Sequence, residues 1–158
     1  MSEHLGHLSP GGGFHMVGVS GKRVTHRVAR AEGSIRMQAG TLARLEAGDT
    51  PKGSVLALAQ VAGIMAAKRT FELVPLAHPV PLERVEVTLV PGDGGVRCES
   101  TVEATARTGV ELEALAAVTG ALLTVYDMLK GVERGMEITG VRLLFKAGGR
   151  SGTYEARQ

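Results

Sequence analysis

Residues 84–106 alternate between polar and apolar side chains in two runs, separated by a short segment of Pro, Gly and Asp. Alternation with a period of two indicates strands that bury one face, and the intervening residues are typical of a tight turn. The sequence therefore predicts an antiparallel hairpin of strands 84–89 and 96–106, with one packed face and one polar face. The predicted inward residues are Val85, Val87, Leu89, Val96, Cys98, Val102 and Ala104.

Two long apolar segments, 53–73 and about 110–132, have the length and composition of helices. The first precedes Pro75, is apolar on almost every side and is rich in Ala and Gly, which permit close packing. Because a helix that is apolar all round is buried all round, we expect it to contact a second subunit as well as the sheet. With 3% aromatic residues and no Trp, the core must consist mainly of Ala, Val and Leu.

The remaining elements complete a recognisable order. A strand is predicted at 24–31, a short helix at 41–47 ending before Gly48, and a last strand at 141–146. The order is then β-α-β-β-α-β, which predicts an α+β, ferredoxin-like fold: an antiparallel sheet with helices packed on one face. The length of 158 residues suits a flexible N-terminal arm at 1–14 and a single catalytic domain at 15–158. His4 and His7 lie in that arm. We interpret the segment as an unstructured tail in preference to a metal-binding site.

Composition excludes several classes of protein. The formal net charge of +2 argues against a dedicated nucleic-acid or anionic-membrane protein. The single cysteine, Cys98, excludes an internal disulfide and a cysteine-ligated zinc site, and it fits a reducing compartment. The N-terminus does not read as a signal peptide, and the apolar run 55–67 is shorter than the roughly 20 residues of a membrane span. We therefore expect a cytoplasmic protein.

No phosphate loop, Rossmann glycine fingerprint or zinc-protease motif occurs, so the chemistry must come from scattered polar residues. His78 is fixed near Pro75 and Pro79 and suits either proton transfer or a helix end. Asp127 and Lys130 share a helix face, as a proton-transfer pair or as a solvent ion pair. Since Asp127 follows eleven mostly apolar residues, we expect it to be partly buried.

Glu111 and Glu113 begin the same helix, where acids also favour the helix dipole. Glu113 and Asp127 differ by about 40° around the helix axis but by about 21 Å along it. They cannot touch one reacting atom in the same chain. They can line opposite ends of an extended ligand, or meet across a subunit interface.

Basic residues form a further group. Lys52 precedes the first long helix, and Lys68 and Arg69 lie near its C-terminal end, where the dipole alone would favour cations. Residues 147–152 contain three glycines and Arg150, and follow Lys146. Such a loop can present backbone N–H groups to a phosphate, or it can be a mobile tail.

Six motifs in order resemble one family. They are Lys52-Gly53, AGIMAAKRT at 62–70, PLAHP at 75–79, TGVELEAL at 108–115, VYDMLK at 125–130, and residues 146–152. Over about residues 15–154 the chain resembles molybdenum cofactor biosynthesis protein C (MoaC), a family of cyclic pyranopterin monophosphate synthases.

The resemblance implies a ferredoxin-like hexamer, a trimer of dimers, with its site at a subunit interface. It implies conversion of 3′,8-cyclo-7,8-dihydro-GTP, supplied by an upstream radical enzyme, to cyclic pyranopterin monophosphate and pyrophosphate. No redox cofactor, metal ligand, nucleic acid or membrane is implied, and the need for a divalent ion such as Mg²⁺ stays open. By motif, Asp127, Lys52 and Lys130 are catalytic. Substrate-binding residues are Leu76, Ala77, His78, Glu111, Leu112 and Glu113, with Arg27, Lys68 and Lys146 in the anionic pocket and Arg150 retaining a loop charge.

Some positions depart from the family pattern. Gly18 and Ala77 replace an Asp and a Cys, and Ala147, Arg150 and Thr153 replace residues of the terminal loop. These departures motivate an alternative, a catalytically impaired paralogue that binds a purine nucleotide or pterin. An RNA-binding ferredoxin-like module is disfavoured, because the polar sheet face carries Arg, Glu and Thr where base stacking needs aromatic rings.

Overall fold

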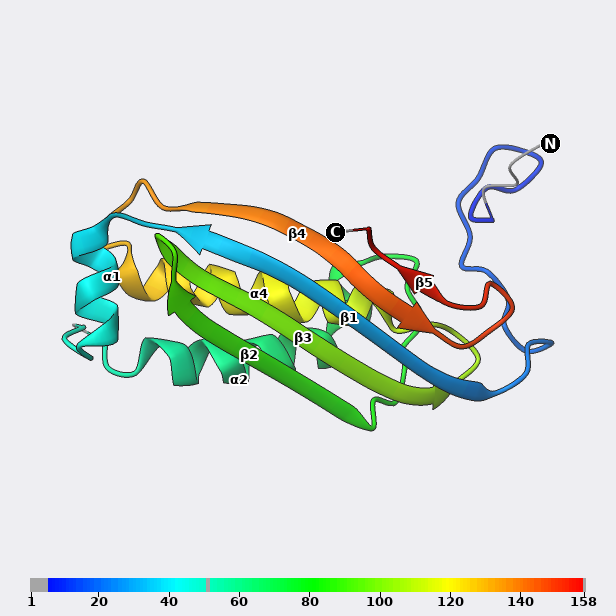
Figure 1. Ribbon diagram of the computed structural model, residues 1–158. Helices are drawn as coiled ribbons and strands as arrows, with labels where there is room; N and C mark the ends of the chain where they lie inside the picture. The colour runs from blue at the N-terminus through cyan, green and yellow to red at the C-terminus, as the bar shows by residue number, and fades with distance from the viewer. Residues whose placement is uncertain (1–5, 51, 158) are drawn as a thin grey trace.

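The computed structural model describes residues 6–50 and 52–157, which form one sheet with helices on a single face (Figure 1). The elements in chain order are β1 (Thr25–Arg36), α1 (Ala39–Glu46), α2 (Val55–Lys68), α3 (Thr70–Leu73), β2 (Arg84–Gly92), β3 (Gly95–Ala106), α4 (Glu111–Leu129), β4 (Glu137–Ala147) and β5 (Tyr154–Glu155). The strands are ordered β2-β3-β1-β4-β5, and every neighbouring pair is antiparallel. This arrangement confirms the ferredoxin-like prediction, with β5 added at one edge.

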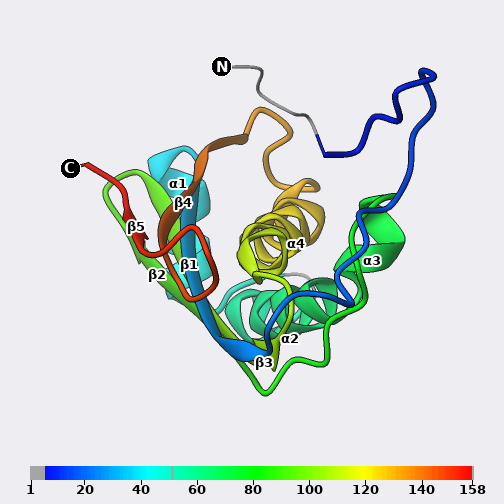
Figure 2. The same cartoon turned by 90° about the vertical axis from the view of Figure 1, so that its right-hand side faces the viewer.

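The two faces of the sheet differ as the alternation predicts. Viewed end-on, α2 and α4 cover one face and leave the other open (Figure 2). Val87, Cys98 and Val102 point into the core with at most 1% exposure. The open face carries ion pairs instead, including Glu32 between Arg97 and Arg142. Those two arginines hold the pKa of Glu32 below its ordinary value, although partial burial opposes them.

The helices α2 and α4 run antiparallel and approach closely through glycine and alanine. A Cβ atom added at Gly63 would lie 2.8 Å from the carbonyl oxygen of Ala117, and one at Gly120 would lie 2.6 Å from the Cβ of Ala66. Both distances are shorter than an ordinary contact, so neither position has room for a side chain. The small residues of α2 therefore serve the close packing that the sequence predicts.

Several predicted boundaries were wrong. The strand predicted at 84–89 continues to Gly92, because Pro91 and Gly92 of the predicted turn pair with Val96 and Gly95. The helix predicted at 53–73 divides at Arg69, where the hydroxyl of Thr70 donates to the carbonyl oxygens of Ala66 and Ala67 and competes with helix continuation. The first strand continues to Arg36 through Gly33, whose missing side chain makes room for Val118. The last strand begins at Glu137, because residues 137–139 pair with β1.

The predicted arm lies partly outside the described residues, which exclude 1–5 and therefore His4. Within residues 6–14, Leu8 and Phe14 form an isolated antiparallel bridge. The Nδ1 atom of His7 lies 3.3 Å from the carbonyl oxygen of His15, which accepts a hydrogen bond when that nitrogen carries the proton. The mobility of the arm stays a prediction.

α4 is the central helix of the core. It is long and apolar enough to cross a bilayer by length and composition, yet 56% of that segment is buried inside the fold. Ala117, Leu122 and Val125 are completely buried against the sheet and α2. This burial is typical of a core helix. Because α4 is packed along its length, its two ends are held at a fixed separation.

Candidate active site

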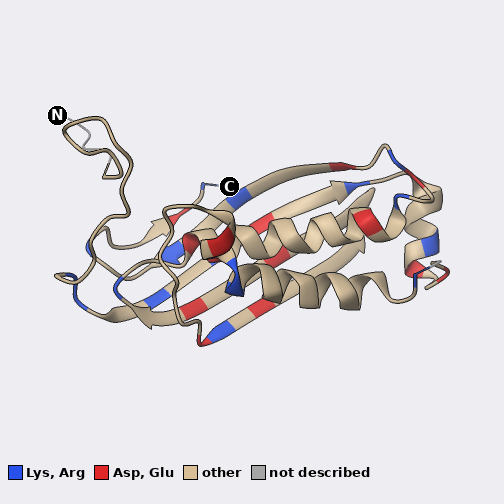
Figure 3. Cartoon of the chain, turned by 180° about the vertical axis from the view of Figure 1, so that it is seen from behind, with Lys and Arg blue, Asp and Glu red and all other residues tan. Residues whose placement is uncertain are grey.

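Most of the charged residues predicted for the site lie near the two ends of α4. Figure 3 shows the acidic and basic positions of the chain from behind. Asp127 and Lys130 lie at the C-terminal end of α4, and Glu111 and Glu113 lie at its N-terminal end. Glu113 and Asp127 both lie in α4, 14 residue steps apart, so the separation of about 21 Å expected from the sequence applies. One chain therefore presents two separate sets of groups.

The first set is the aspartate–lysine cluster, Lys52, Asp127 and Lys130. The Nζ atom of Lys52 donates to the carbonyl oxygen of Asp127 at 3.0 Å and lies 3.6 Å from Oδ2. The Nζ atom of Lys130 lies 2.7 Å from Oδ1. The antiparallel packing of α2 against α4 explains this meeting, because it places the segment before α2 beside the end of α4.

The prediction that Asp127 is partly buried was wrong, since its side chain is 58% exposed in the single chain. It lies on the side of α4 opposite the buried stripe of Val125, Met128 and Leu129. The hydrogen bond from Lys130, the charge of Lys130 and the charge of Lys52 lower the pKa of Asp127. Asp127 is therefore a carboxylate at neutral pH, held between two ammonium groups.

At the other end of α4, Glu113 is buried, with 5% exposure. Burial raises the pKa of Glu113 to about 7; a bond from its own backbone N–H opposes this shift, and the nearby Glu111 carboxylate adds to it. Ala117 and Ala121, one and two turns further along the same side of α4, are both fully buried. Helical phase alone does not predict this burial, because Asp127 lies within about 40° of Glu113 around the axis and is exposed. A carboxyl group that titrates near neutrality can either donate or accept a proton.

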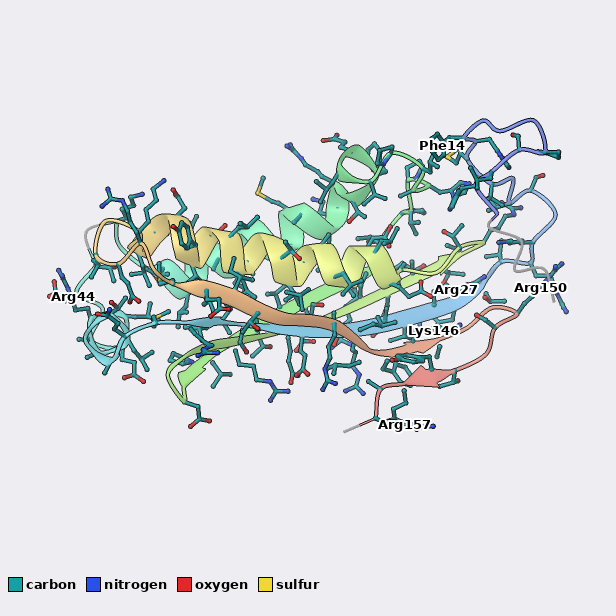
Figure 4. All side chains as sticks on the ribbon, turned by 90° about the horizontal axis from the view of Figure 1, so that it is seen from above. Phe14, Arg27, Arg44, Lys146, Arg150 and Arg157 are labelled. Carbon is teal, nitrogen blue, oxygen red and sulfur yellow. The ribbon has the colours of Figure 1, made fainter. Side chains whose placement is uncertain are left out.

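Arg27, Lys146 and Arg150 lie at this same end of the molecule, opposite Arg44 of α1 (Figure 4). Arg27 is buried and donates from Nε to the carbonyl oxygen of Ala106 at 3.3 Å and from Nη2 to that of Arg107 at 3.1 Å. Lys146 donates to the hydroxyl of Ser151. The contacts of Arg27 join β1 to the end of β3, and that of Lys146 joins β4 to the loop that follows it.

Two adjoining cavities share Glu111 at this end. One, of about 640 Å³, is lined by Arg27, Glu111 and Arg150 among others, and the second, of about 440 Å³, is lined by Glu111 and Lys146. Lys68 lines a separate hollow of about 410 Å³ with Glu83. The predicted anionic pocket of Arg27, Lys68 and Lys146 is thus spread over three hollows of one chain.

The other predicted binding residues are half-buried or exposed. Leu76, Ala77 and His78 are half-buried in the connection between α3 and β2. Leu112 is 43% exposed at the start of α4. Among the described residues, no group of three or more His, Cys, Asp and Glu side chains is placed to hold a metal ion. The carboxylates and cations at the two ends of α4 can supply acid–base chemistry and anion binding.

Residues 16–149 match the model of the MoaC family. The chain belongs to the MoaC family. It is 53% identical over 154 residues to the cyclic pyranopterin monophosphate synthase of Dinoroseobacter shibae, covering 96% of this chain and 98% of the relative. It is 54% identical to the protein of that name from Cereibacter sphaeroides (96% and 97% covered) and 51% identical to that from Novosphingobium aromaticivorans (98% and 98%). This MoaC-family chain thus matches those relatives over almost their whole length.

Proposed function

We propose that this chain is a cyclic pyranopterin monophosphate synthase, a lyase of molybdenum cofactor biosynthesis. It converts 3′,8-cyclo-7,8-dihydro-GTP to cyclic pyranopterin monophosphate and pyrophosphate. The observation that carries the proposal is the aspartate–lysine cluster, whose three members converge from two segments in a chain more than 50% identical to proteins of that name.

The cluster provides the proton donors and acceptors that ring opening and closure require. Asp127 is ionised and accepts a proton, while the ammonium groups of Lys52 and Lys130 donate protons and hold the carboxylate in place. The lysines approach one carboxylate from different sides, so each can serve a different atom of the substrate. Loss of any one of the three should remove a proton-transfer step.

The N-terminal end of α4 supports recognition of the purine-derived ring and the phosphates. The carboxyl groups of Glu111 and Glu113 can accept hydrogen bonds from the amino and ring N–H groups of a guanine-like ring. Cations such as Arg27, Lys146 and Arg150 stabilise the charge on departing pyrophosphate. Leu76, Ala77, His78 and Leu112 complete the contacts that we assign to the substrate.

We infer that the two ends of α4 act together in an oligomer, with one subunit supplying the aspartate–lysine cluster and its neighbour supplying the end that carries Glu113. The separation of about 21 Å prevents both ends of one chain from touching one reacting centre. α2 also leaves an apolar surface open in the single chain: Leu58, Val61 and Met65 are each about half exposed, as is Leu123 of α4. An unpartnered apolar face of this kind favours contact with another subunit. A hexamer built as a trimer of dimers is the assembly that the family resemblance implies, and we propose it here.

The proposal also sets the cellular context. The protein acts in the cytoplasm on a small molecule that an upstream radical enzyme produces. The reaction involves no redox step in this chain, so we propose that no redox cofactor is resident. Whether a divalent ion accompanies the triphosphate is tested by measuring turnover with and without a chelator.

The direct test is to incubate the purified protein with the cyclised dihydro-GTP substrate and to measure the pterin product and pyrophosphate. We expect Lys52→Ala, Lys130→Ala and Asp127→Asn each to abolish turnover while the oligomer persists. Asp49→Asn is the matched control, since Asp49 is also an exposed acid but pairs with Arg44. Near-normal turnover of Asp127→Asn would refute the catalytic assignment. Substrate binding without turnover in the unaltered protein would support the impaired-paralogue alternative instead.

A further inference from the structure

Lys130 stands where α4 ends, and the turn that follows, residues 130–136, connects α4 to β4. Helix ends fray, because the last carbonyl groups have no partner within the helix. The side chains of Lys130 and Asp127 are 52% and 58% exposed, and an exposed ion pair of this kind does little to fix either group. The position of the Lys130 ammonium, 2.7 Å from Oδ1 of Asp127, therefore depends on the backbone of the 130–136 turn.

Two side chains that the motifs do not assign fasten this turn. The first is Tyr126, which directly precedes Asp127 and is half-buried against the core. Its hydroxyl donates a hydrogen bond to the carbonyl oxygen of Arg134 at 3.0 Å, and its own carbonyl oxygen accepts the N–H of Lys130 at 2.8 Å. Tyr126 thus joins the last turn of α4 to residue 134, and Lys130 lies in the chain between the two joined points.

The second is Glu133, which fastens the same turn to α1. Its Oε2 atom accepts the backbone N–H of Gln38 at 3.0 Å, and Gln38 is the residue that precedes α1. Figure 1 shows α1 beside the end of α4 from which the turn leaves. Within the part of the chain that the structure describes, no Lys, Arg or His side chain pairs with the Glu133 carboxylate. α1 leads to the loop that carries Lys52, whose Nζ atom lies 3.6 Å from Oδ2 of Asp127, so Glu133 connects the supports of both lysines.

We propose that Tyr126 and Glu133 are positioning residues of the reaction, which fix the 130–136 turn and thereby place the Lys130 ammonium against Asp127. The inference rests on the proposed function and adds two residues that act through Lys130 without touching the substrate. Proton transfer requires donor and acceptor to be held at hydrogen-bond distance, and a displacement of about 1 Å can lower a rate about a hundredfold. Loss of either anchor frees the turn, so Lys130 spends less time within reach of the reacting atoms.

The first test measures kcat and KM of the intact protein with the cyclised dihydro-GTP substrate. We expect Tyr126→Phe, which removes only the hydroxyl, to lower kcat about tenfold. KM should hardly change, because the residues assigned to the ring and the phosphates lie at the other end of α4. Thr124→Val is the matched control: the hydroxyl of Thr124 also donates to a carbonyl oxygen, that of Gly120 at 2.9 Å, but this bond lies within α4 and does not involve the turn. Its kcat should stay unchanged.

Glu133 is tested by two substitutions that differ in hydrogen bonding. Glu133→Ala removes the acceptor of the Gln38 N–H and should lower kcat as Tyr126→Phe does, whereas Glu133→Gln keeps an oxygen that accepts this N–H and should restore most of kcat. Hydrogen exchange measured by mass spectrometry gives a second readout that needs no turnover. Amides of the 130–136 turn should exchange about fivefold faster in Tyr126→Phe and Glu133→Ala, and at the original rate in Thr124→Val and Glu133→Gln.

The outcomes separate this inference from the function on which it rests. If the unaltered protein turns over the substrate and Tyr126→Phe loses no more kcat than Thr124→Val, the positioning role is wrong and the function stands. Equal loss of kcat in Glu133→Ala and Glu133→Gln also overturns the role of Glu133, because the hydrogen bond is then not what matters. If exchange within the turn rises as expected but the unaltered protein has no turnover, the proposed function fails and the anchoring of the turn stands. Unchanged exchange in both Tyr126→Phe and Glu133→Ala would overturn the anchoring itself.

Discussion

Replacing Gly120 by Ala tests whether the close approach of α2 and α4 governs the stability of this fold. Helix propensity alone predicts that the substitution stabilises the protein by about 1 kcal/mol. The new Cβ, however, would lie 2.6 Å from the Cβ of Ala66, where an ordinary contact is about 3.5–4.0 Å. The helices must then separate by about 1 Å, and overpacking of this kind costs roughly 1–3 kcal/mol. We therefore expect Gly120→Ala to be destabilised by about 1 kcal/mol.

The measurement is urea denaturation followed by circular dichroism at a fixed protein concentration, because oligomerisation shifts apparent stability. Gly40→Ala is the control: Gly40 lies in α1 with no heavy atom within 4 Å of an added Cβ, so propensity should act alone and stabilise. In Gly120→Ala/Ala66→Gly the clash is absent, so the two changes should couple favourably by about 1–3 kcal/mol. Equal stabilisation by Gly40→Ala and Gly120→Ala, or strict additivity in the double variant, would refute the steric argument.

Three further predictions follow from buried and open positions. Because the pKa of Glu113 is raised from 4.5 to about 7, its protonated form adds stability that is fully present below pH 4.5 and is lost as pH rises through about 7, by up to about 3 kcal/mol. Glu113→Gln should therefore weaken the dependence of the unfolding free energy on pH. An unchanged dependence would contradict this. Burial raises the pKa of the Cys98 thiol to about 12, so iodoacetamide should label it only after unfolding, and rapid labelling of the native protein would be evidence against its burial. Gly18→Asp should change stability by less than about 0.5 kcal/mol, since a Cβ at Gly18 meets nothing within 4 Å; a larger loss in urea denaturation would show an unseen contact.

The sheet and its helices could be predicted because their signals are periodic. Alternation at 84–106 fixed which side chains enter the core, and the order of strands and helices was sufficient for the ferredoxin-like topology. The boundaries that were wrong depend on tertiary contacts. The break at Arg69 follows from a side-chain hydrogen bond of Thr70, and the passage of β1 through Gly33 depends on Val118 of a distant helix. Neither contact leaves a periodic pattern in the sequence.

The candidate site could be predicted only where residues are joined by one helix or one motif. Asp127 and Lys130 are three residues apart, so their contact was expected, and Lys52 was assigned only through the family resemblance. The exposure of Asp127 was missed because apolar neighbours along the chain do not show which side of the helix is covered. The cavity of about 640 Å³ could not be predicted, because two of its lining residues, Lys22 and Arg107, lie in segments that meet only after β1 and β3 have paired.

Placing one set of groups at each end of α4 has a genetic consequence. If the two sets meet across a two-fold axis, each pair of subunits contains two identical sites, and every site takes one end from each subunit. Consider a pair in which one subunit lacks Asp127 and the other lacks Arg27. One site then contains both defects, and the second site contains neither. Co-expression of two inactive alleles should therefore restore about a quarter of the sites after random pairing, so that neither defect alone decides the phenotype of a cell that carries both.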